Sequence, residues 1–406
     1  MQYDLIVVGG GAAGFFGAIQ AAEMKPGMKI LILEKTNKVL SKVRVSGGGR
    51  CNVTHHEYNP FSLARHYPRG EKALKNLFKF YHAEHVVNWF KSKDVLLKTE
   101  DDGRMFPVTD SSETIIECFL KEARRHNIKI ETGWHVKSIA IALDGFHILS
   151  TNDGSLSASK VLIASGGNPH LQSYAWIENL QHSIAAPIPS LFTFNDSRKN
   201  FVDLMGVAVP SGEVRIEGTK FSQKGPILIT HWGLSGPAVI KLSAWAAEYL
   251  HSVNYTFTAL VNWVDRPEDD VRTSILNWKS ERLRQKVVTD SFFGLPQRLS
   301  RKLIEQAEID ESKTWAEASN KNINKLVEML IRTPFHIKGK TTFKEEFVTC
   351  GGVNLTDVDL ETMESKKVKH IYFAGEVLNI DGETGGFNFQ SAWTTAYIAA
   401  KAIVSQ

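Results

Sequence analysis

The residues with the clearest chemical meaning stand at the start of the chain. Gly9, Gly11 and Gly14 form a G-x-G-x-x-G directly after the apolar run 5–8, and a second apolar run ends at the acidic Glu34. In a dinucleotide-binding βαβ unit, such glycines allow a tight turn, close approach of the backbone to a pyrophosphate, and close packing of helix on strand. The pyrophosphate faces the positive end of the helix, and the acid accepts a hydrogen bond from a ribose hydroxyl. We therefore predict that the chain binds a dinucleotide.

A second glycine-rich segment, 374–390, lies near the C-terminus and precedes a predicted helix. In flavoenzymes a helix that begins at such a turn points its N-terminus at the N1–C2=O edge of the flavin and stabilises the charge of the reduced ring. The alternative is a turn that only starts the last helix. Because both halves of a split site are present, we predict FAD as the cofactor. No second G-x-G-x-x-G follows a strand, so NAD(P)H is expected only as a transient reductant.

Polar residues near these glycines have two interpretations each. Glu376 and Asp381 could orient ribityl hydroxyls of the flavin, or they could be solvated loop acids. In the glycine-rich segment 46–52, Arg50 offers a planar donor fork to a phosphate or a flavin carbonyl. Cys51 in the same segment is a candidate proton donor if a C=C bond is reduced. The alternative for Cys51, which we favour, is a buried small apolar residue.

A second candidate acid, His231, lies in the segment 230–237. Histidine suits acid–base work near neutral pH, and Trp232 beside it could be a stacking platform over a flavin. The alternative is purely mechanical: Ser235 would cap the following helix, and the glycines would turn the strand into it. The sequence favours neither interpretation.

The elements that must position these residues follow an interrupted α/β pattern. After the βαβ start, apolar residues have helical spacing in 71–98 and 112–126, short strands alternate over 129–161, and a strand at 161–164 ends in glycines. Short strands over 190–263 are typical of a small β-barrel, and 266–332 is helical in pattern. A final strand and helix lie at the C-terminus.

This order predicts an α/β fold, a Rossmann-like FAD-binding domain with an inserted β-barrel plus helical subdomain. The expected boundaries are 1–189 and 340–406 for the discontinuous FAD-binding domain, 190–265 and 333–340 for the barrel, and 266–332 for the helical subdomain.

Composition limits the class of protein. The 406 residues, 43% hydrophobic and 23% charged, are ordinary for a globular chain of two or three domains. The first strand begins almost at once, which leaves no room for a signal peptide, and no apolar run reaches the ~20 residues that span a bilayer. Three cysteines without a C-x-x-C pair predict a cytoplasmic location, and we expect no metal and no membrane partner. A net charge of +4 permits a polyanionic partner without demanding one.

Several longer segments resemble the BaiN/YhiN-like family of bacterial FAD-dependent flavoproteins. They are SGGGRCNVT (46–54), GRMFPV (103–108), THWGLSGPA (230–238), VTCGGV (348–353) and YFAGEVLNIDGETGGFNFQSAW (372–393). The resemblance covers nearly the whole chain and implies the interrupted FAD domain described above. It also implies reduction of an unsaturated ring, either a steroid-like enone or uridine in ribosomal RNA.

The glycine segments and this resemblance together give a set of candidate cofactor-binding residues. They are Gly9, Gly11, Ala12, Ala13, Gly14, Glu34, Lys35, Arg44, Gly48, Gly49, Arg50, Cys51, Asn52, Val136, Ala164, Gly166, Gly375, Glu376, Asp381, Gly386, Asn388 and Phe389.

The stretch 65–98 has a composition that suits RNA. It holds eight lysines and arginines, with Tyr67, Phe78, Tyr81 and Trp89 interleaved, which could track phosphates and stack bases. The alternative, which we favour, is a pair of amphipathic helices with basic solvated faces, because the aromatic residues have core spacing.

The sequence thus predicts a cytoplasmic FAD-dependent oxidoreductase that takes electrons transiently from NAD(P)H and reduces an activated ring C=C. Ribosomal RNA uridine and a small enone are the two substrate classes, with a slight preference for RNA. A flavin-binding redox sensor or binding platform without catalysis is the remaining alternative.

Overall fold

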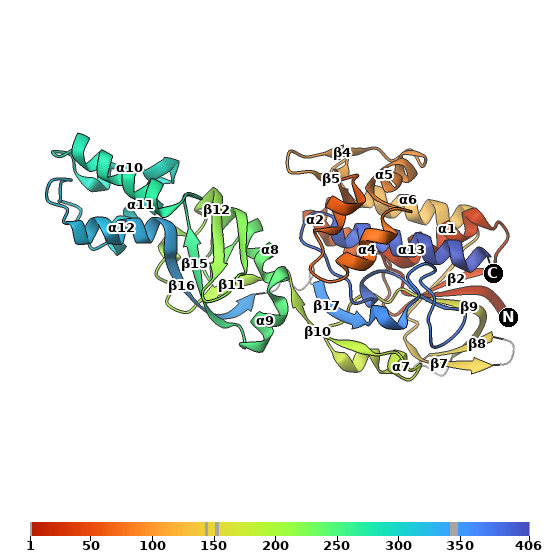
Figure 1. Cartoon of the computed structure of the whole chain (residues 1–406). Helices are drawn as coiled ribbons and strands as arrows, with labels where there is room; N and C mark the ends of the chain where they lie inside the picture. Colours follow the sequence, from red (N-terminus) through yellow and green to blue (C-terminus); the bar gives the residue numbers. More distant parts are fainter. Residues whose placement is uncertain (1, 143–144, 151–153, 342–347, 406) are drawn as a thin grey trace. The chain divides into compact units, whose positions relative to one another are not determined.

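The computed structural model of the chain describes residues 2–142, 145–150, 154–341 and 348–405 (Figure 1). The remaining residues lie outside the described part: 1, 143–144, 151–153, 342–347 and 406. The predicted domains include these residues, and the predicted strands of 129–161 include 143–144 and 151–153. The chain forms two compact units, Met1–Ser190 with Lys344–Gln406, and Leu191–Phe343. Among the described residues, no helix has both the length and the apolar character that crossing a membrane requires.

The first unit is built on a sheet whose central strands are parallel. Its strand order is β6 (Lys129–Thr132), β2 (Ile30–Glu34), β1 (Gln2–Val8), β9 (Ser155–Ile163), β8 (Gly145–Ser150) and β7 (Val136–Ala142), with β18 (Ile371–Phe373) also paired to β9. Strand β1 is parallel to β2 and β9, and β18 is parallel to β9. The apolar run of β1 is buried on both faces, as continuous hydrophobic strands of parallel sheets are.

Register brings the carboxyl ends of these strands to one edge. Val8 of β1 lies opposite Leu33 of β2 and Ile163 of β9, and Ile163 lies opposite Phe373 of β18. The turns that follow β1, β2, β9 and β18 therefore leave the sheet side by side. In open α/β sheets, ligands bind at this edge.

Helices cover the sheet and the small strands beside it. They are α1 (Ala12–Met24), α2 (Ser41–Gly49), α3 (Pro60–Ala64), α4 (Glu71–Leu77), α5 (Ala83–Lys91), α6 (Ser112–Arg125), α7 (Ala175–Glu178) and α13 (Phe387–Ser405). Shorter strands pair as β3 (Thr54–His55), β5 (Arg104–Pro107) and β4 (Leu97–Thr99), and as β10 (Ile184–Ser190) with β17 (Val348–Val353). Helices α1 and α13 pack together at Gly17, where an added Cβ would lie 2.7 Å from Leu162 and 3.6 Å from Ala396 (Figure 1).

The second unit contains a closed antiparallel barrel. Its strand order is β11 (Thr193–Asp196), β14 (Gly233–Ser235), β13 (Ser222–Ile229), β12 (Ala208–Ile216), β15 (Thr256–Asn262) and β16 (Thr333–Thr341). The helices of this unit are α8 (Pro237–Trp245), α9 (Ala247–Ser252), α10 (Glu268–Glu281), α11 (Gln297–Gln306) and α12 (Asn320–Arg332). Barrel and helices share one continuous hydrophobic core.

Helix α8 begins one residue later than expected if Ser235 were its cap. Ser235 is not the cap of α8. It belongs to β14 and pairs with Leu228, and Gly236, with φ of +96°, is the N-cap ahead of Pro237. The interpretation of Ser235 as a cap was wrong, because Ser235 is the last residue of β14 and lies one position before the N-cap.

A largely buried charge cluster joins α1 and α6 to the segment after α5. The ammonium of Lys93 forms an ion pair with Glu23 of α1 and lies 3.2 Å from a carboxylate oxygen of Glu122 on α6. Glu122 is 2% exposed. Burial alone would lower the pKa of Lys93, but the hydrogen bonds and charges of the two glutamates outweigh burial and raise it. Lys93 therefore stays charged and neutralises carboxylates that would otherwise be costly to bury.

We expect Lys93→Met to destabilise the protein by about 3–5 kcal/mol, because it leaves carboxylates of the cluster without their cation. Urea unfolding followed by circular dichroism measures this. The matched control is Lys91→Met, an exposed lysine two residues away, which should change the free energy of unfolding by no more than ~0.5 kcal/mol. Equal effects of the two variants would mean that the cluster does not stabilise the fold.

Candidate cofactor site

The first glycine turn follows β1, and its glycines differ in whether the surrounding protein atoms leave room for a side chain. An added Cβ at Gly9, where φ is +119°, would lie 2.2 Å from the carbonyl oxygen of Ala164, and one at Gly14 would lie 1.9 Å from the carbonyl oxygen of Gly9. At Gly11 φ is −93°, and an added Cβ would meet no atom within 4 Å. Protein packing therefore requires Gly9 and Gly14, whereas the space in front of Gly11 is left open.

That open space faces the N-terminus of α1. Gly11 is the N-cap of this helix and has no side chain to cap it, and the first turn holds no acidic residue. The first turn runs through Ala12 and Ala13, so its amides can meet an anion. An added Cβ at Gly48, Gly49 or Gly166 would meet nothing within 4 Å either, although the positive φ of each already favours glycine there. These positions fit close approach of a phosphate-containing ligand.

Glu34 is held at the same turn. Its carboxylate accepts hydrogen bonds from the backbone amide of Gly10 at 3.0 Å and from that of Thr36 at 2.8 Å. Its carbonyl accepts from the amide of Trp134, two residues before the buried Val136 of β7. Lys35 is exposed beside it.

The turns after β9 and β18 meet the first turn. An added Cβ at Gly375 would lie 2.7 Å from the Cβ of Ala13, and one at Gly167 would lie 3.0 Å from the carboxyl group of Glu376. Glu376 pairs with Lys42 at 2.7 Å and accepts from the amide of Thr349 at 3.2 Å. The predicted residues of 9–14, 164–167 and 375–376 therefore converge.

The segment after the glycine-rich loop of α2 is bonded to the start of α13. The side-chain amide of Asn52, in the orientation that satisfies both its groups, accepts from the amide of Gly386 at 3.0 Å and donates to the carbonyl of Thr54 at 3.1 Å. The Thr54 hydroxyl donates to Gln390 at 2.6 Å, and the indole of Trp393 donates to the carbonyl of Val53 at 2.9 Å.

The loop before α13 is rigidified from within. Asn388 accepts from the amide of Gly382 at 2.9 Å and donates to its carbonyl at 3.0 Å. Phe389 stacks on Trp393 of the same helix, with ring centroids 5.5 Å apart. The ring of Phe389 therefore contributes to helix packing.

Asp381 is not a solvated loop acid, and that alternative was wrong for it. The side chain is fully buried, forms an ion pair with Arg69, and accepts from the hydroxyl of Ser190 at 3.0 Å. Burial raises the pKa of the Asp381 carboxyl, and the Arg69 guanidinium only partly offsets this. Asp381 thus anchors the C-terminal loop to the segment before α4.

The arginines expected at the cofactor have carboxylate partners. Arg50 donates to Glu100 at 2.6 Å, and its guanidinium lies 4.0 Å above the ring of Phe106. Arg44 pairs with Glu113. Either arginine would have to share its donors to meet a phosphate, so their roles stay predictions.

The two candidate acids have different environments. Cys51 has no exposed surface, and burial raises the pKa of its thiol to about 12. This environment favours the packing role over proton donation. His231 is exposed in the turn between β13 and β14 of the second unit, with Trp232 at 4.2 Å between ring centroids. Its role stays a prediction.

Three aromatic residues of 65–98 do not face solvent. Tyr67 and Phe78 are fully buried and Tyr81 is 5% exposed, and all three belong to the core. Core packing therefore explains their spacing, as the favoured interpretation of 65–98 expected, and the alternative that these three stack bases was wrong.

Two histidines at the C-terminal loop were missed by sequence reasoning. Nδ1 of His66 lies 3.2 Å from a carboxylate oxygen of Glu383, and Nδ1 of His55 lies 3.0 Å from the carbonyl oxygen of Gly385. Both rings stack on Phe387, the first residue of α13. The signal was three histidines in the segment 55–66, at 55, 56 and 66, but nothing local indicated which residues they would meet. The His66–Glu383 pair lies beside the predicted flavin turn.

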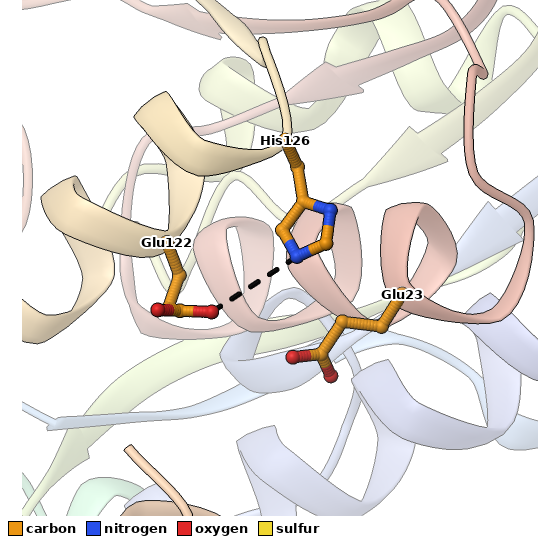
Figure 2. A group of neighbouring side chains, drawn as sticks. All are labelled: Glu23, Glu122 and His126. Carbon is orange, nitrogen blue, oxygen red and sulfur yellow. Dashed lines mark ion pairs between the residues drawn. The ribbon is translucent and has the colours of Figure 1, made fainter. Parts of the chain in front are cut away.

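A separate group of side chains has ligand atoms within 4.8 Å of one another: Glu23, Glu122 and His126 (Figure 2). His126 lies 3.9 Å from Glu122. A metal ion here would have to displace Lys93, whose ammonium already neutralises the two glutamates. The expectation that the protein uses no metal stays a prediction.

Comparison with known proteins defines the family. The family described as "HI0933-like protein Rossmann domain" matches residues 3–402, so the chain belongs to it. The chain is 24% identical over 405 residues to a 3-dehydro-bile acid delta(4,6)-reductase of Clostridium scindens, covering 98% of each protein. It is 28% identical to a ribosomal RNA dihydrouridine synthase of Escherichia coli, covering 100% of this chain and 98% of that protein. The predicted family resemblance is confirmed.

Solved structures agree on the fold. A 3-ketosteroid-delta4-(5alpha)-dehydrogenase from Rhodococcus jostii superposes with a TM-score of 0.55 at 14% identity, covering 100% of this chain and 97% of that one. A 3-ketosteroid delta1-dehydrogenase from Sterolibacterium denitrificans gives a TM-score of 0.52 at 13% identity, covering 100% and 99%. With the sheet and barrel above, these findings confirm the predicted fold class.

The burial of Cys51 has a chemical consequence that thiol labelling measures. All three cysteines are buried, so we expect native protein at pH 8 to react with a thiol reagent more than about tenfold slower than protein in urea, where three thiols react. Cys51→Ala should remove one of the three in urea and leave the native rate unchanged. A fast native reaction mapped to Cys51 by mass spectrometry would contradict the packing role and support Cys51 as an acid.

Proposed function

We propose that the protein is an FAD-dependent oxidoreductase that reduces an activated C=C bond in a ring. One observation carries the cofactor assignment: the turns after β1, β9 and β18 leave one edge of the sheet, and Gly11 keeps open space at the N-terminus of α1. Neither packing nor backbone angles require glycine at that position. A pyrophosphate that must approach the backbone does require it.

The chain's residues hold the cofactor in two groups. The amides at the start of α1 meet the pyrophosphate, and the carboxylate of Glu34, fixed by Gly10 and Thr36, accepts from a ribose hydroxyl. The start of α13, held by Asn52 and Asn388, faces the flavin ring. FAD would supply hydride transfer, for which NAD(P)H that binds transiently is the proposed source of electrons.

The relatives support the reaction type and leave two substrate classes. One is named a delta(4,6)-reductase of a bile acid, and the others are named ribosomal RNA dihydrouridine synthases. Both reactions reduce a C=C bond in a ring. We favour uridine in ribosomal RNA, with a small steroid-like enone as the alternative. The net charge of +4 and an exposed group of lysines described below favour the RNA. Three buried cysteines without a C-x-x-C pair suit the reducing cytoplasm, where we propose that the protein acts.

A single methyl group tests the cofactor assignment. We expect Gly11→Ala to fold with stability within ~0.5 kcal/mol of wild type, because the methyl group meets no protein atom. It should bind FAD at least about tenfold more weakly, because the methyl group occupies the approach of the pyrophosphate. Absorbance of purified protein and FAD titration measure the loss.

The contrasting variant is Gly14→Ala. Its methyl group would lie 1.9 Å from the carbonyl oxygen of Gly9, so we expect a loss of stability of about 1–3 kcal/mol or more. Full FAD affinity in a well-folded Gly11→Ala protein would contradict the proposed site. A wild-type protein that takes up no FAD would contradict the proposed function as a whole.

The RNA substrate predicts a modification that can be measured. A strain that lacks the gene should lose dihydrouridine at a position in ribosomal RNA, and mass mapping of the RNA detects this. Restoring the wild-type gene should restore the modification, whereas Gly11→Ala should restore less of it. Unchanged dihydrouridine in the deletion strain would count against RNA and leave the enone, which an anaerobic assay of NADPH oxidation with a 3-keto-4-ene steroid would detect.

A further inference from the structure

An exposed group of lysines and phenylalanines lies on α3, on α4 and just after α4. Its members, here termed the basic aromatic patch, are Phe61, Lys72, Lys75, Lys79 and Phe80. The side chains of Phe61 and Phe80 are 47% and 63% exposed, so both rings are open to a ligand. Neither belongs to the core that contains their neighbours.

Two lysines of the patch share one side of α4. Lys72 and Lys75 are three residues apart and exposed, while Ala73, Leu74 and Leu77 on the opposite side are buried. Lys79 lies in the turn that follows the helix. The ammonium groups of Lys75 and Lys79 lie 4.9 and 5.8 Å from the centroid of the Phe61 ring. Each cation therefore sits beside an aromatic face.

The patch is strongly positive. Within the described residues, no ion pair joins Lys72, Lys75 or Lys79 to a carboxylate, and Lys79 donates only to the Asn76 side chain, at 3.1 Å. Over 60–80 the sequence holds one acidic residue, Glu71, against these lysines and two arginines. Unpaired cations beside exposed rings are the combination that holds phosphates and stacks bases of single-stranded nucleic acid.

The backbone connects this patch to the C-terminal loop of the cofactor site. Arg69, which pairs with Asp381, and Gly70 immediately precede α4. A Cβ added at Gly70 would lie 2.8 Å from the side chain of Ile380. The carbonyl of His66 accepts a hydrogen bond from the amide of Glu383. A ligand bound along α4 would therefore lie next to the loop that leads into α13.

A membrane surface does not fit the same patch. A helix that lies in a bilayer interface buries a long apolar face in lipid, but α4 spans only Glu71–Leu77 and its apolar side is already covered by the core. What remains exposed is charge with isolated rings, which suits a flexible polyanion with planar bases.

We propose that the basic aromatic patch binds a single-stranded segment of the RNA substrate, next to the uridine that enters the cofactor site. This inference rests on the proposed function and adds to it the surface that selects RNA. The lysines meet phosphates, and Phe61 and Phe80 stack on unpaired bases.

Binding of a fluorescein-labelled single-stranded RNA of about ten nucleotides, measured by anisotropy over a range of salt, tests the proposal. The triple variant Lys72→Gln, Lys75→Gln, Lys79→Gln should lower the slope of log K against log salt by about 2, since each phosphate contact on a single strand contributes ~0.7. Phe61→Ala and Phe80→Ala should each weaken binding about fivefold or more and leave the slope unchanged.

The matched control removes the same charge elsewhere. Lys220→Gln, Lys286→Gln, Lys321→Gln changes three exposed lysines of the second unit and should leave affinity within about twofold and the slope unchanged. An equal loss of RNA affinity in both triple variants would overturn the proposal, because the affinity would then depend only on the net charge of the protein. RNA affinity equal to that of the wild type in the triple patch variant would also overturn the proposal. So would a result in which these lysines bind phosphatidylserine vesicles and do not bind RNA.

Flavin content separates the two proposals. The patch variants should retain wild-type FAD absorbance and bleaching by NADPH, because none of the five residues belongs to the cofactor turns. An RNA defect with intact flavin supports the patch. Intact flavin with no RNA binding by the wild type would overturn the patch and leave the flavin assignment standing, whereas a wild-type protein without FAD refutes the proposed function.

Discussion

The pairing of β9 with β1 on one side and β18 on the other is the interaction on which the site depends. It places Val8, Ile163 and Phe373 at one level, so both ends of the chain deliver their glycine turns to the same edge. Packing of α1 on α13 at Gly17 reinforces this closure. A ligand held at that edge would contact residues from both ends of the chain, and its binding would therefore stabilise the first unit as a whole.

The glycines of the site divide into two kinds once the surrounding atoms are known. Gly9, Gly14 and Gly386 are required by the fold, because a Cβ at each would lie within 2.5 Å of a backbone oxygen. Gly11 has ordinary backbone angles and empty space before it. A ligand that approaches the backbone would explain why glycine stands at position 11, whereas the fold does not explain it. The G-x-G-x-x-G pattern alone contains both kinds and cannot separate them.

Much of the fold was predictable because its signals are local. The run before Gly9, the acid at Glu34 and the glycines before α13 each act within a few residues. The partners of side chains were not predictable, because Asn52 meets Gly386 and His66 meets Glu383 only after the chain closes. The same limit explains why the aromatic residues of 65–98 carried an ambiguous meaning: helical spacing fits both a core and a binding face until burial is known.

Family membership leaves the substrate undetermined. The relatives include proteins named for a bile acid and for ribosomal RNA at similar identity to this chain, each matching almost its full length. Under the proposed function, substrate choice comes from surfaces outside the turns proposed to hold FAD. The segment 54–80 has the required position, since His66 and Arg69 bond to the C-terminal loop while the lysines of α4 face solvent. Because its buried side carries the loop contacts and its exposed side carries the charge, the exposed side can change without disturbing the cofactor turns.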